Sequence, residues 1–189
     1  MADFDWPALR AAWVADDPYQ PEPGVEEHFR TKYEIAARLQ PTSICEIGVR
    51  AGYSALAFLQ AVPRAAYLGI DLDEGTWGGI SGYLRHAVER LRPYRAEFML
   101  ADSQRLAALV PQWEFWHIDG DHSAGGALHD LVLADASGAR WMLLDDYDFI
   151  PHVRIAGDQF AWEHRDRWTA EYVSDGGYRG NLLLSRKAS

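Results

Sequence analysis

The amino-acid sequence predicts a single α/β domain, built on a mostly parallel sheet whose last strands form an antiparallel hairpin. The chain has 189 residues, which is about the size of one domain. From residue 35 onward, short apolar runs alternate with helical patterns, the order expected of parallel strands joined by crossover helices. The runs are apolar throughout rather than alternating, as in strands that are covered on both faces.

Each element follows from a local pattern. A helix is expected to end at Leu39, before Pro41. A second helical pattern begins at Tyr53, and a third covers about 80–91. Five apolar runs predict the parallel strands: 44–47, 66–70, 97–100, 115–118 and 141–144. Residues 168–173 and 180–184, joined by the Gly-containing turn 174–177, predict the hairpin. Residues 1–30 include the proline-rich segment 16–24 and are expected to form an N-terminal arm or cap, which leaves 31–189 as the main domain.

Composition excludes several classes of protein. The formal net charge of −10 argues against a nucleic-acid partner, because little would offset phosphate repulsion. No apolar stretch approaches the ~18–20 residues that span a bilayer, and the first residues lack the basic and apolar regions of a secretory signal. A cytoplasmic globular protein without a membrane partner is expected. The lone Cys45 excludes an intrachain disulfide and is interpreted as a small buried hydrophobe.

A glycine-containing turn follows the first predicted strand and precedes a helix. Gly48 and Gly52 let the backbone turn tightly and approach a ligand, while the helix N-terminus offers free N–H groups to an anionic group. Arg50 stands where the second glycine of a dinucleotide motif would admit phosphates, and Glu46 would repel them. The motif therefore favours a ligand with cationic and hydroxyl groups, although a tight turn without any ligand has the same pattern.

Polar residues also follow the second and third predicted strands. Asp71 ends the second strand, at a spacing from Glu46 that suits a carboxylate binding the two hydroxyls of a ribose. Asp102 and Ser103 follow the third strand, near where an adenine ring would lie. Ordinary polar caps at strand ends are the alternative.

Acidic residues gather where the fourth and fifth predicted strands end. Asp119, Asp145 and Asp146 are expected to converge there, because ligands of open α/β sheets bind outside the carboxyl ends of the strands. Three carboxylates supply the oxygen ligands of a hard divalent cation, which favours magnesium over zinc. Alternatively, Asp146 and Asp121 are solvated turn residues and Ser123 is a helix N-cap.

Histidines near these acids are candidates for a general base. His122 lies in the turn after the fourth strand, and an ordinary imidazole pKa near ~6.5 suits proton abstraction. His152 is the reserve candidate. His117 belongs to the strand and is interpreted as a satisfied core group.

The glycine motif at 46–54, together with 118–123 and 145–147, resembles class I S-adenosylmethionine-dependent methyltransferases. The pairing of the last two motifs is similar to the metal-dependent O-methyltransferase branch that includes the macrocin-type macrolide-sugar enzymes (methyltransferase domain family 24). The resemblance covers roughly residues 33–184. It implies a Rossmann-like, doubly wound seven-stranded sheet, S-adenosyl-L-methionine and Mg2+ as cofactors, and a small-molecule acceptor, a sugar or natural-product hydroxyl.

The resemblance also implies roles for individual residues. The implied cofactor-binding residues are Glu46, Gly48, Arg50, Gly52, Tyr53, Ser54, Asp71, Asp102, Ser103 and Asp119. The implied metal ligands are Asp119, Asp145 and Asp146, and the histidine His122 is the implied base. The chain departs from the family pattern at 124–126 and 150–153, beside the acceptor pocket, so the acceptor stays open. The short arm leaves the pocket open or completed by a second subunit, as in a homo-oligomer.

Three alternatives remain beside the magnesium-dependent O-methyltransferase. A metal-independent N- or C-methyltransferase would use the same cofactor, and a non-catalytic binding module would keep only the fold. A nicotinamide-dependent dehydrogenase is disfavoured by Arg50 and Glu46. Five aromatic residues are candidates for the wall of an acceptor pocket: Trp6, Trp13, Tyr19, Trp77 and Trp162.

Overall fold

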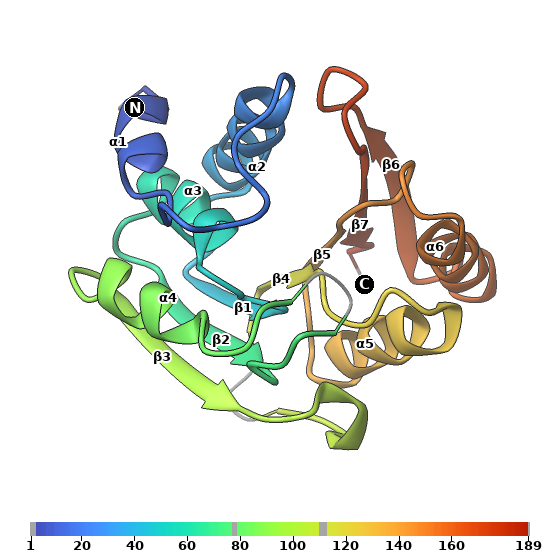
Figure 1. Ribbon diagram of the computed structural model, residues 1–189. Coiled ribbons are helices and arrows are strands. Elements are labelled where there is room, and N and C mark those ends of the chain that lie inside the picture. The colour runs from blue at the N-terminus through green and yellow to red at the C-terminus, as the bar shows by residue number, and fades with distance from the viewer. Residues whose placement is uncertain (1–2, 77–78, 110–112, 189) are drawn as a thin grey trace.

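The computed structural model describes residues 3–76, 79–109 and 113–188, which form one sheet covered by helices on both faces (Figure 1). The strands are β1 (Ser43–Ile47), β2 (Ala66–Asp71), β3 (Arg95–Leu100), β4 (Phe115–Ile118), β5 (Trp141–Leu144), β6 (Trp168–Val173) and β7 (Asn181–Arg186). The helices are α1 (Trp6–Ala11), α2 (Val25–Leu39), α3 (Tyr53–Ala61), α4 (Leu84–Arg90), α5 (Ala124–Ala136) and α6 (Pro151–Glu163).

The sheet has the order β3-β2-β1-β4-β5-β7-β6. Strands β1 to β5 are parallel, whereas β7 runs antiparallel to both β5 and β6. This order confirms the predicted Rossmann-like, mostly parallel sheet with its C-terminal hairpin. The chain reverses its direction of travel across the sheet between β1 and β4, which is the place where ligands of such sheets bind.

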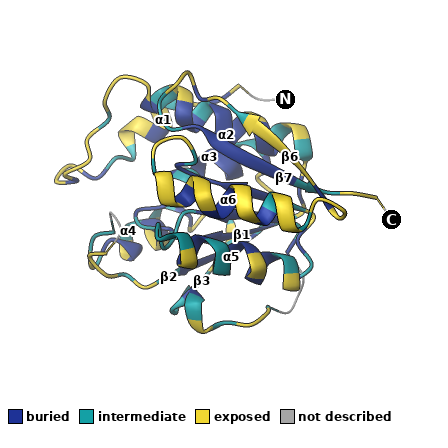
Figure 2. Ribbon diagram, turned by 90° about the vertical axis from the view of Figure 1, so that its right-hand side faces the viewer, coloured by how far each residue is buried: buried dark blue, intermediate teal, exposed yellow. Residues whose placement is uncertain are grey.

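Two hydrophobic layers hold the sheet between its helices. On one face α2 packs on α3, and the core there includes Phe58 and Phe115; on the other face α5 packs on α6 over Trp116 and Phe160. Figure 2 shows α5 and α6 lying across the sheet with their buried sides turned toward it. Cys45 is fully buried in the second layer and free, in agreement with its interpretation as a core residue.

Two elements differ from the sequence expectation. Strand β3 was expected to be covered on both faces, but it is an edge strand with alternating exposure, and Leu100 is 70% exposed. The helix expected over about 80–91 begins only at Leu84, because the chain turns at Gly82, whose φ of 79° is left-handed. Residues 12–24 contain no helix or strand, as the proline-rich composition predicted.

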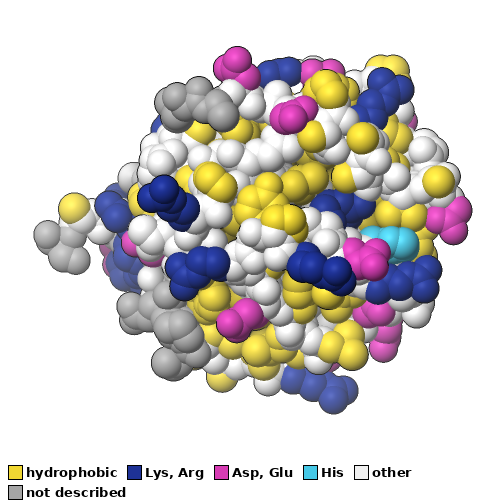
Figure 3. All heavy atoms as spheres, turned by 90° about the vertical axis from the view of Figure 1, so that its left-hand side faces the viewer, with side chains coloured by type: hydrophobic (Ala, Val, Ile, Leu, Met, Phe, Trp, Pro, Cys, Tyr) yellow, Lys and Arg dark blue, Asp and Glu magenta, His cyan; other side chains and the backbone are white. Residues whose placement is uncertain are grey.

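The surface carries charges of both signs. On the face that α1, α3, α4 and β3 present, basic, acidic and hydrophobic side chains are interspersed (Figure 3). Within the described residues, no helix combines the length and the apolar composition needed to cross a membrane.

Candidate active site

The glycine turn, defined here as residues 48–52, connects β1 to α3. Gly48 has a φ of 84°, and a Cβ added to it would lie 2.0 Å from the backbone oxygen of Asp119. Only glycine therefore lets this turn lie directly against the residue that follows β4. Gly52, with a φ of 77°, precedes α3 and provides no side-chain cap, so the first N–H groups of α3 are open to an anionic ligand.

Asp71, at the end of β2, holds the glycine turn. One of its carboxylate oxygens, Oδ2, accepts hydrogen bonds from the backbone N–H groups of Val49 (2.7 Å) and Arg50 (2.8 Å). The other, Oδ1, accepts from the N–H of Asp73 at 2.6 Å. Asp71, the residue predicted to bind the ribose, thus lies beside the glycine turn.

Three further predicted cofactor residues direct their side chains elsewhere. Arg50 forms an ion pair with Asp17, and Tyr53 donates a hydrogen bond from its hydroxyl to the same carboxylate at 3.0 Å. Ser54 accepts a hydrogen bond from the Lys32 ammonium at 3.2 Å. The side chains of all three predicted cofactor residues thus have partners within the protein, and their role in cofactor binding stays a prediction.

The turn after β3 contains the residues predicted to lie near adenine. Asp102 caps the short 3₁₀ turn η1 (Ser103–Arg105) by accepting from the N–H of Gln104 at 3.0 Å. Ser103 is buried, and the Gln104 amide donates to Asp130 of α5 at 3.0 Å. Asp130 is fully buried, and its second oxygen has no hydrogen-bond partner.

Asp130 should make the stability of the protein depend on pH. Burial raises the pKa of Asp130 to about 7, so the unfolded chain loses this proton first as the pH rises above 4. The free energy of unfolding therefore falls as the pH rises from about 4 to about 7. Asp130→Asn, which keeps the acceptor for Gln104, is expected to raise the free energy of unfolding at pH 8 by about 2–4 kcal/mol, at 1.36 kcal/mol per pKa unit. Urea unfolding at pH 8 and pH 5 checks this, since a gain of equal size at both pH values would refute the assignment.

Glu46 does not face the glycine turn but lies in a buried polar network. Its Oε1 is 2.8 Å from Nδ1 of His117, its Oε2 accepts from the Tyr67 hydroxyl, and only 1% of the residue is exposed. Burial and the Lys32 charge lower the pKa of His117, but its contacts with Asp145 and Glu46 outweigh them and raise it to about 9. Both carboxylate oxygens of Glu46 therefore have partners in the core, and its expected contact with a cofactor stays a prediction.

Asp145 belongs to the same network. Its Oδ2 accepts from Lys32 and lies 3.4 Å from Nε2 of His117 and 3.6 Å from Nε2 of His28. Burial would raise the pKa of Asp145, but the Lys32 ammonium holds it well below its usual range. Asp145 was expected to be a metal ligand, yet its carboxylate faces α2, because neighbouring residues at the end of a strand point in opposite directions.

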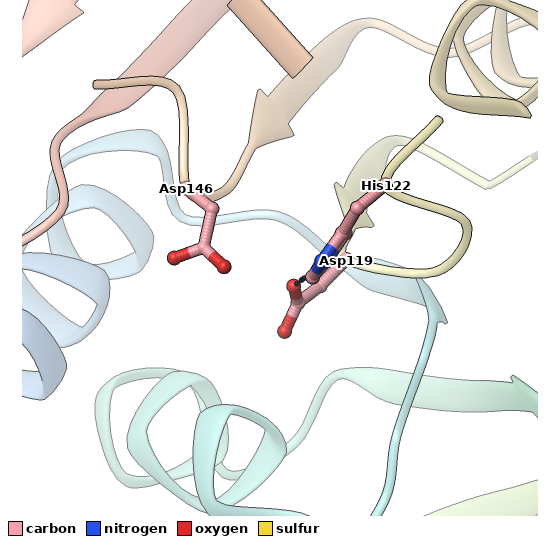
Figure 4. A group of neighbouring side chains, drawn as sticks. All are labelled: Asp119, His122 and Asp146. Atoms are coloured by element: carbon pink, nitrogen blue, oxygen red, sulfur yellow. Dashed lines mark hydrogen bonds and ion pairs between the residues drawn. The ribbon is translucent and has the colours of Figure 1, made fainter. Parts of the chain in front are cut away.

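Asp119, His122 and Asp146 come together at the ends of β4 and β5 (Figure 4). One ligand atom from each lies within 4.8 Å of the others, and His122 Nε2 is 3.1 Å from Asp119 Oδ1. Asp146, with a left-handed φ of 53°, turns its carboxylate away from Asp145, and Arg179 donates to both of its oxygens at 3.0 and 3.1 Å. These three residues are the strongest candidates for a metal centre in the described part of the chain.

The titration of this group reflects its crowded negative charge. Burial, followed by the charges of Asp145 and Asp119, raises the pKa of Asp146 to about 6. Burial lowers the pKa of His122, but the hydrogen bond and charge of Asp119 outweigh it and raise it to about 9. As it stands, the imidazole is protonated at neutral pH. A bound cation would compensate the same carboxylates and favour a neutral His122.

The remaining candidates lie apart from this group. His152 is exposed in the first turn of α6 and is not among the three grouped residues. Trp13 stacks on Tyr53 with ring centroids 3.9 Å apart, and Trp162 on α6 is 69% exposed. Trp77 lies outside the described residues. Ser123 caps α5 by accepting from the N–H of Gly126 at 3.0 Å, in agreement with the capping interpretation.

Several solved structures with the same architecture are methyltransferases. A methyltransferase of Podospora anserina, PaMTH1 bound to S-adenosylhomocysteine, has a TM-score of 0.68 and 15% identity, over 96% of this chain and 88% of that one. An O-methyltransferase of Bacillus cereus in complex with S-adenosylhomocysteine gives 0.65 and 17%, over 95% and 88%. The Streptomyces achromogenes O-methyltransferase TomG, involved in tomaymycin synthesis and bound to S-adenosylmethionine, gives 0.59 and 15%, over 95% and 99%. At these identities the likeness establishes the fold, that of class I S-adenosylmethionine-dependent methyltransferases.

The sequence itself matches a family model. The model, described as a methyltransferase domain, matches residues 45–147, which is more than half of the chain. The protein therefore belongs to this methyltransferase family and is an S-adenosylmethionine-dependent methyltransferase. No curated protein matches the chain.

Proposed function

We propose that the protein is a magnesium-dependent O-methyltransferase that acts on a hydroxyl of a small molecule, a sugar or another natural product. The observation that carries this proposal is the convergence of Asp119, His122 and Asp146 beside the glycine turn, at the place where the strand order reverses. Membership of the methyltransferase family indicates S-adenosylmethionine as the methyl donor. The acidic group would bind the cation beside that donor.

The residues present fit a divalent cation. Asp119 and Asp146 would bind it through carboxylate oxygens, with His122 as a third ligand or as the base. Burial, and after it the charges of Asp145 and Asp119, raise the pKa of Asp146, and a bound cation would compensate the charge of these carboxylates. Bound Mg2+ supplies a Lewis acid that lowers the pKa of an acceptor hydroxyl and orients it.

The chain's own residues would bind the donor and accept the proton. The open N–H groups at the start of α3 suit the carboxylate of the methionine portion, and Asp71 suits the ribose hydroxyls. Asp102 and Ser103 suit the adenine end. His122, once neutral, would take the hydroxyl proton. Glu46 is paired with His117, so it does not stabilise the sulfonium charge that methyl transfer removes.

One observation favours a metal-independent N- or C-methyltransferase as the second candidate. Arg179 already contacts both oxygens of Asp146, and protonated His122 is paired with Asp119, so the carboxylates are balanced without a cation. In this case Arg179 would be the permanent partner of the Asp146 carboxylate, and no metal ion would bind that carboxylate.

The response of turnover to chelation separates the two candidates. Release of S-adenosylhomocysteine would be measured with a panel of catechols, phenols and hydroxylated sugars as acceptors. EDTA is expected to abolish turnover, and Mg2+ in excess of EDTA to restore it. Undiminished turnover in EDTA would exclude the magnesium-dependent mechanism and favour the second candidate.

We also propose a cellular setting and partners for the protein. The net charge of −10 supports a protein that does not bind nucleic acid. A cytoplasmic location agrees with the composition of the chain. A homo-oligomer in which a second subunit completes the acceptor pocket is part of the same proposal.

A further inference from the structure

The segment between α1 and α2 lies against the glycine turn. Residues 12–20, named the arm segment here, pass over the start of α3 (Figure 1). Asp17 is only 2% exposed although it lies in a segment without helix or strand. Such burial of a carboxylate requires specific partners, and both of its partners outside the arm segment belong to the glycine turn or to the first residue of α3.

Both oxygens of the Asp17 carboxylate are engaged. Oδ1 forms the ion pair with Arg50 and also accepts from the N–H of Tyr19 at 2.9 Å. Oδ2 accepts from the Tyr53 hydroxyl at 3.0 Å, and that hydroxyl accepts from the N–H of Val14 at 2.9 Å. Asp17 thus joins the arm segment to two residues on either side of Gly52.

Arg50 connects the arm segment to the carboxylate at the end of β2. Its backbone has a φ of 50°, a conformation that non-glycine residues rarely adopt, and its N–H donates to Asp71 at 2.8 Å. Its guanidinium lies 4.7 Å from the ring centroid of Tyr19 and 5.8 Å from that of Tyr83. The side chain is held on several sides while the backbone forms the turn, so fixing the side chain stabilises the unusual backbone conformation.

We propose that Asp17 is a positioning residue for the methyl donor: by holding Arg50 it keeps the glycine turn in its binding conformation. Binding of the cofactor and ordering of the arm segment are then coupled, and each strengthens the other. The inference rests on cofactor binding by the glycine turn and is independent of the metal and the acceptor. A purely structural role of the arm segment, as packing for α3, is the alternative.

Titration of S-adenosylhomocysteine by calorimetry tests this assignment. Asp17→Asn removes the negative charge that Arg50 contacts and is expected to raise the Kd about tenfold, the equivalent of 1.4 kcal/mol. Asp16→Asn is the matched control, because Asp16 is the exposed neighbour, and its Kd should equal that of the wild type. Asp17→Glu, which keeps the charge, should recover part of the affinity.

A second control separates positioning from packing. Gln60 connects α3 to the residue before α1, because its side-chain oxygen accepts from the N–H of Asp5 at 2.9 Å and its amide donates to the Asp5 carbonyl at 3.2 Å. If the arm segment only stabilised the fold, Gln60→Ala would weaken binding as Asp17→Asn does. The assignment predicts that Gln60→Ala lowers the melting temperature but leaves the Kd unchanged.

Tyr19→Leu keeps the test decisive if Asp17→Asn does not fold. Tyr19 is 52% exposed, so its loss leaves the core intact while it removes one support of Arg50. A Kd two- to threefold higher is expected, together with slower amide exchange of residues 12–20 when wild-type protein binds S-adenosylhomocysteine. Two results would overturn the coupling and leave the methyltransferase function intact. One is an unchanged Kd in both Tyr19→Leu and Asp17→Asn, and the other is amide exchange of residues 12–20 that is the same with and without S-adenosylhomocysteine. Failure of the wild type to bind would overturn the methyltransferase function as well.

Discussion

Replacing Lys32 by methionine is expected to lower the free energy of unfolding by about 3–5 kcal/mol, the usual cost of removing one partner from a buried ion pair. Lys32 is fully buried in α2 and donates to Asp145, to Ser54 at 3.2 Å and to His28 Nε2 at 2.7 Å. Without the ammonium, the Asp145 carboxylate would keep the two histidines and the N–H of Asp146 as partners, none of which carries a fixed positive charge. Guanidinium unfolding measured by circular dichroism checks the value.

Two further variants show whether the buried charge is the cause. Lys187→Met alters an exposed lysine and should change the stability by less than about 0.5 kcal/mol, as surface substitutions usually do. In the double variant Lys32→Met/Asp145→Asn the unpaired charge is gone, so part of the lost stability should return. The assignment would be contradicted by a loss below about 1 kcal/mol in Lys32→Met. A double variant less stable than Lys32→Met would also contradict it, since the ion pair would then not stabilise the residues that follow β5.

Asp146→Asn is expected to reduce magnesium-stimulated methyl transfer on the order of a hundredfold to a thousandfold, because a Lewis acid contributes several kcal/mol and 1.36 kcal/mol is a factor of ten. Asp146 is one of the two carboxylates of the metal group, and it is 3% exposed. The effect should appear in turnover and not in the binding of S-adenosylhomocysteine, whose predicted contacts lie on other elements.

Exposed Asp166, in the turn between α6 and β6, provides the control. Asp166→Asn should match the wild type in turnover and in its response to Mg2+. If Asp146→Asn kept full magnesium-stimulated turnover, the carboxylate would only pair with Arg179. The proposed metal site would then be wrong.

The order of elements could be predicted from the sequence because the apolar runs report burial in a two-sided sheet. The positions of Gly48 and Asp71 followed from the same pattern, since a strand tip can be located once the strand is located. The convergence of Asp119 and Asp146 followed as well, because parallel strands end at one edge of the sheet.

The partners of Asp145 could not be predicted from its neighbours in sequence. Lys32 lies 113 positions earlier, on a helix before the first strand. A signal was present, because Lys32 shares the buried face of α2 with Phe29, Ile35 and Ala36, where a lysine needs an acidic partner. The identity of that partner depends on how α2 docks on the sheet.

Arg179 and Asp17 show the same limit. Arg179 lies in the turn between β6 and β7, and Asp175 fixes that turn by accepting from three successive N–H groups, at 3.1, 3.0 and 2.9 Å. Asp17 lies in an irregular segment with no periodicity to interpret. Both residues act on the site through loops, whose course depends on tertiary contacts rather than on local pattern.

The most direct measurement of the central claim is a calorimetric titration of Mg2+ into the protein saturated with S-adenosylhomocysteine. One ion per chain is predicted for the wild type and for Asp166→Asn, and none for Asp119→Asn or Asp146→Asn. Absence of binding to the wild type, or equal binding in all four proteins, would contradict a magnesium site formed by Asp119, His122 and Asp146.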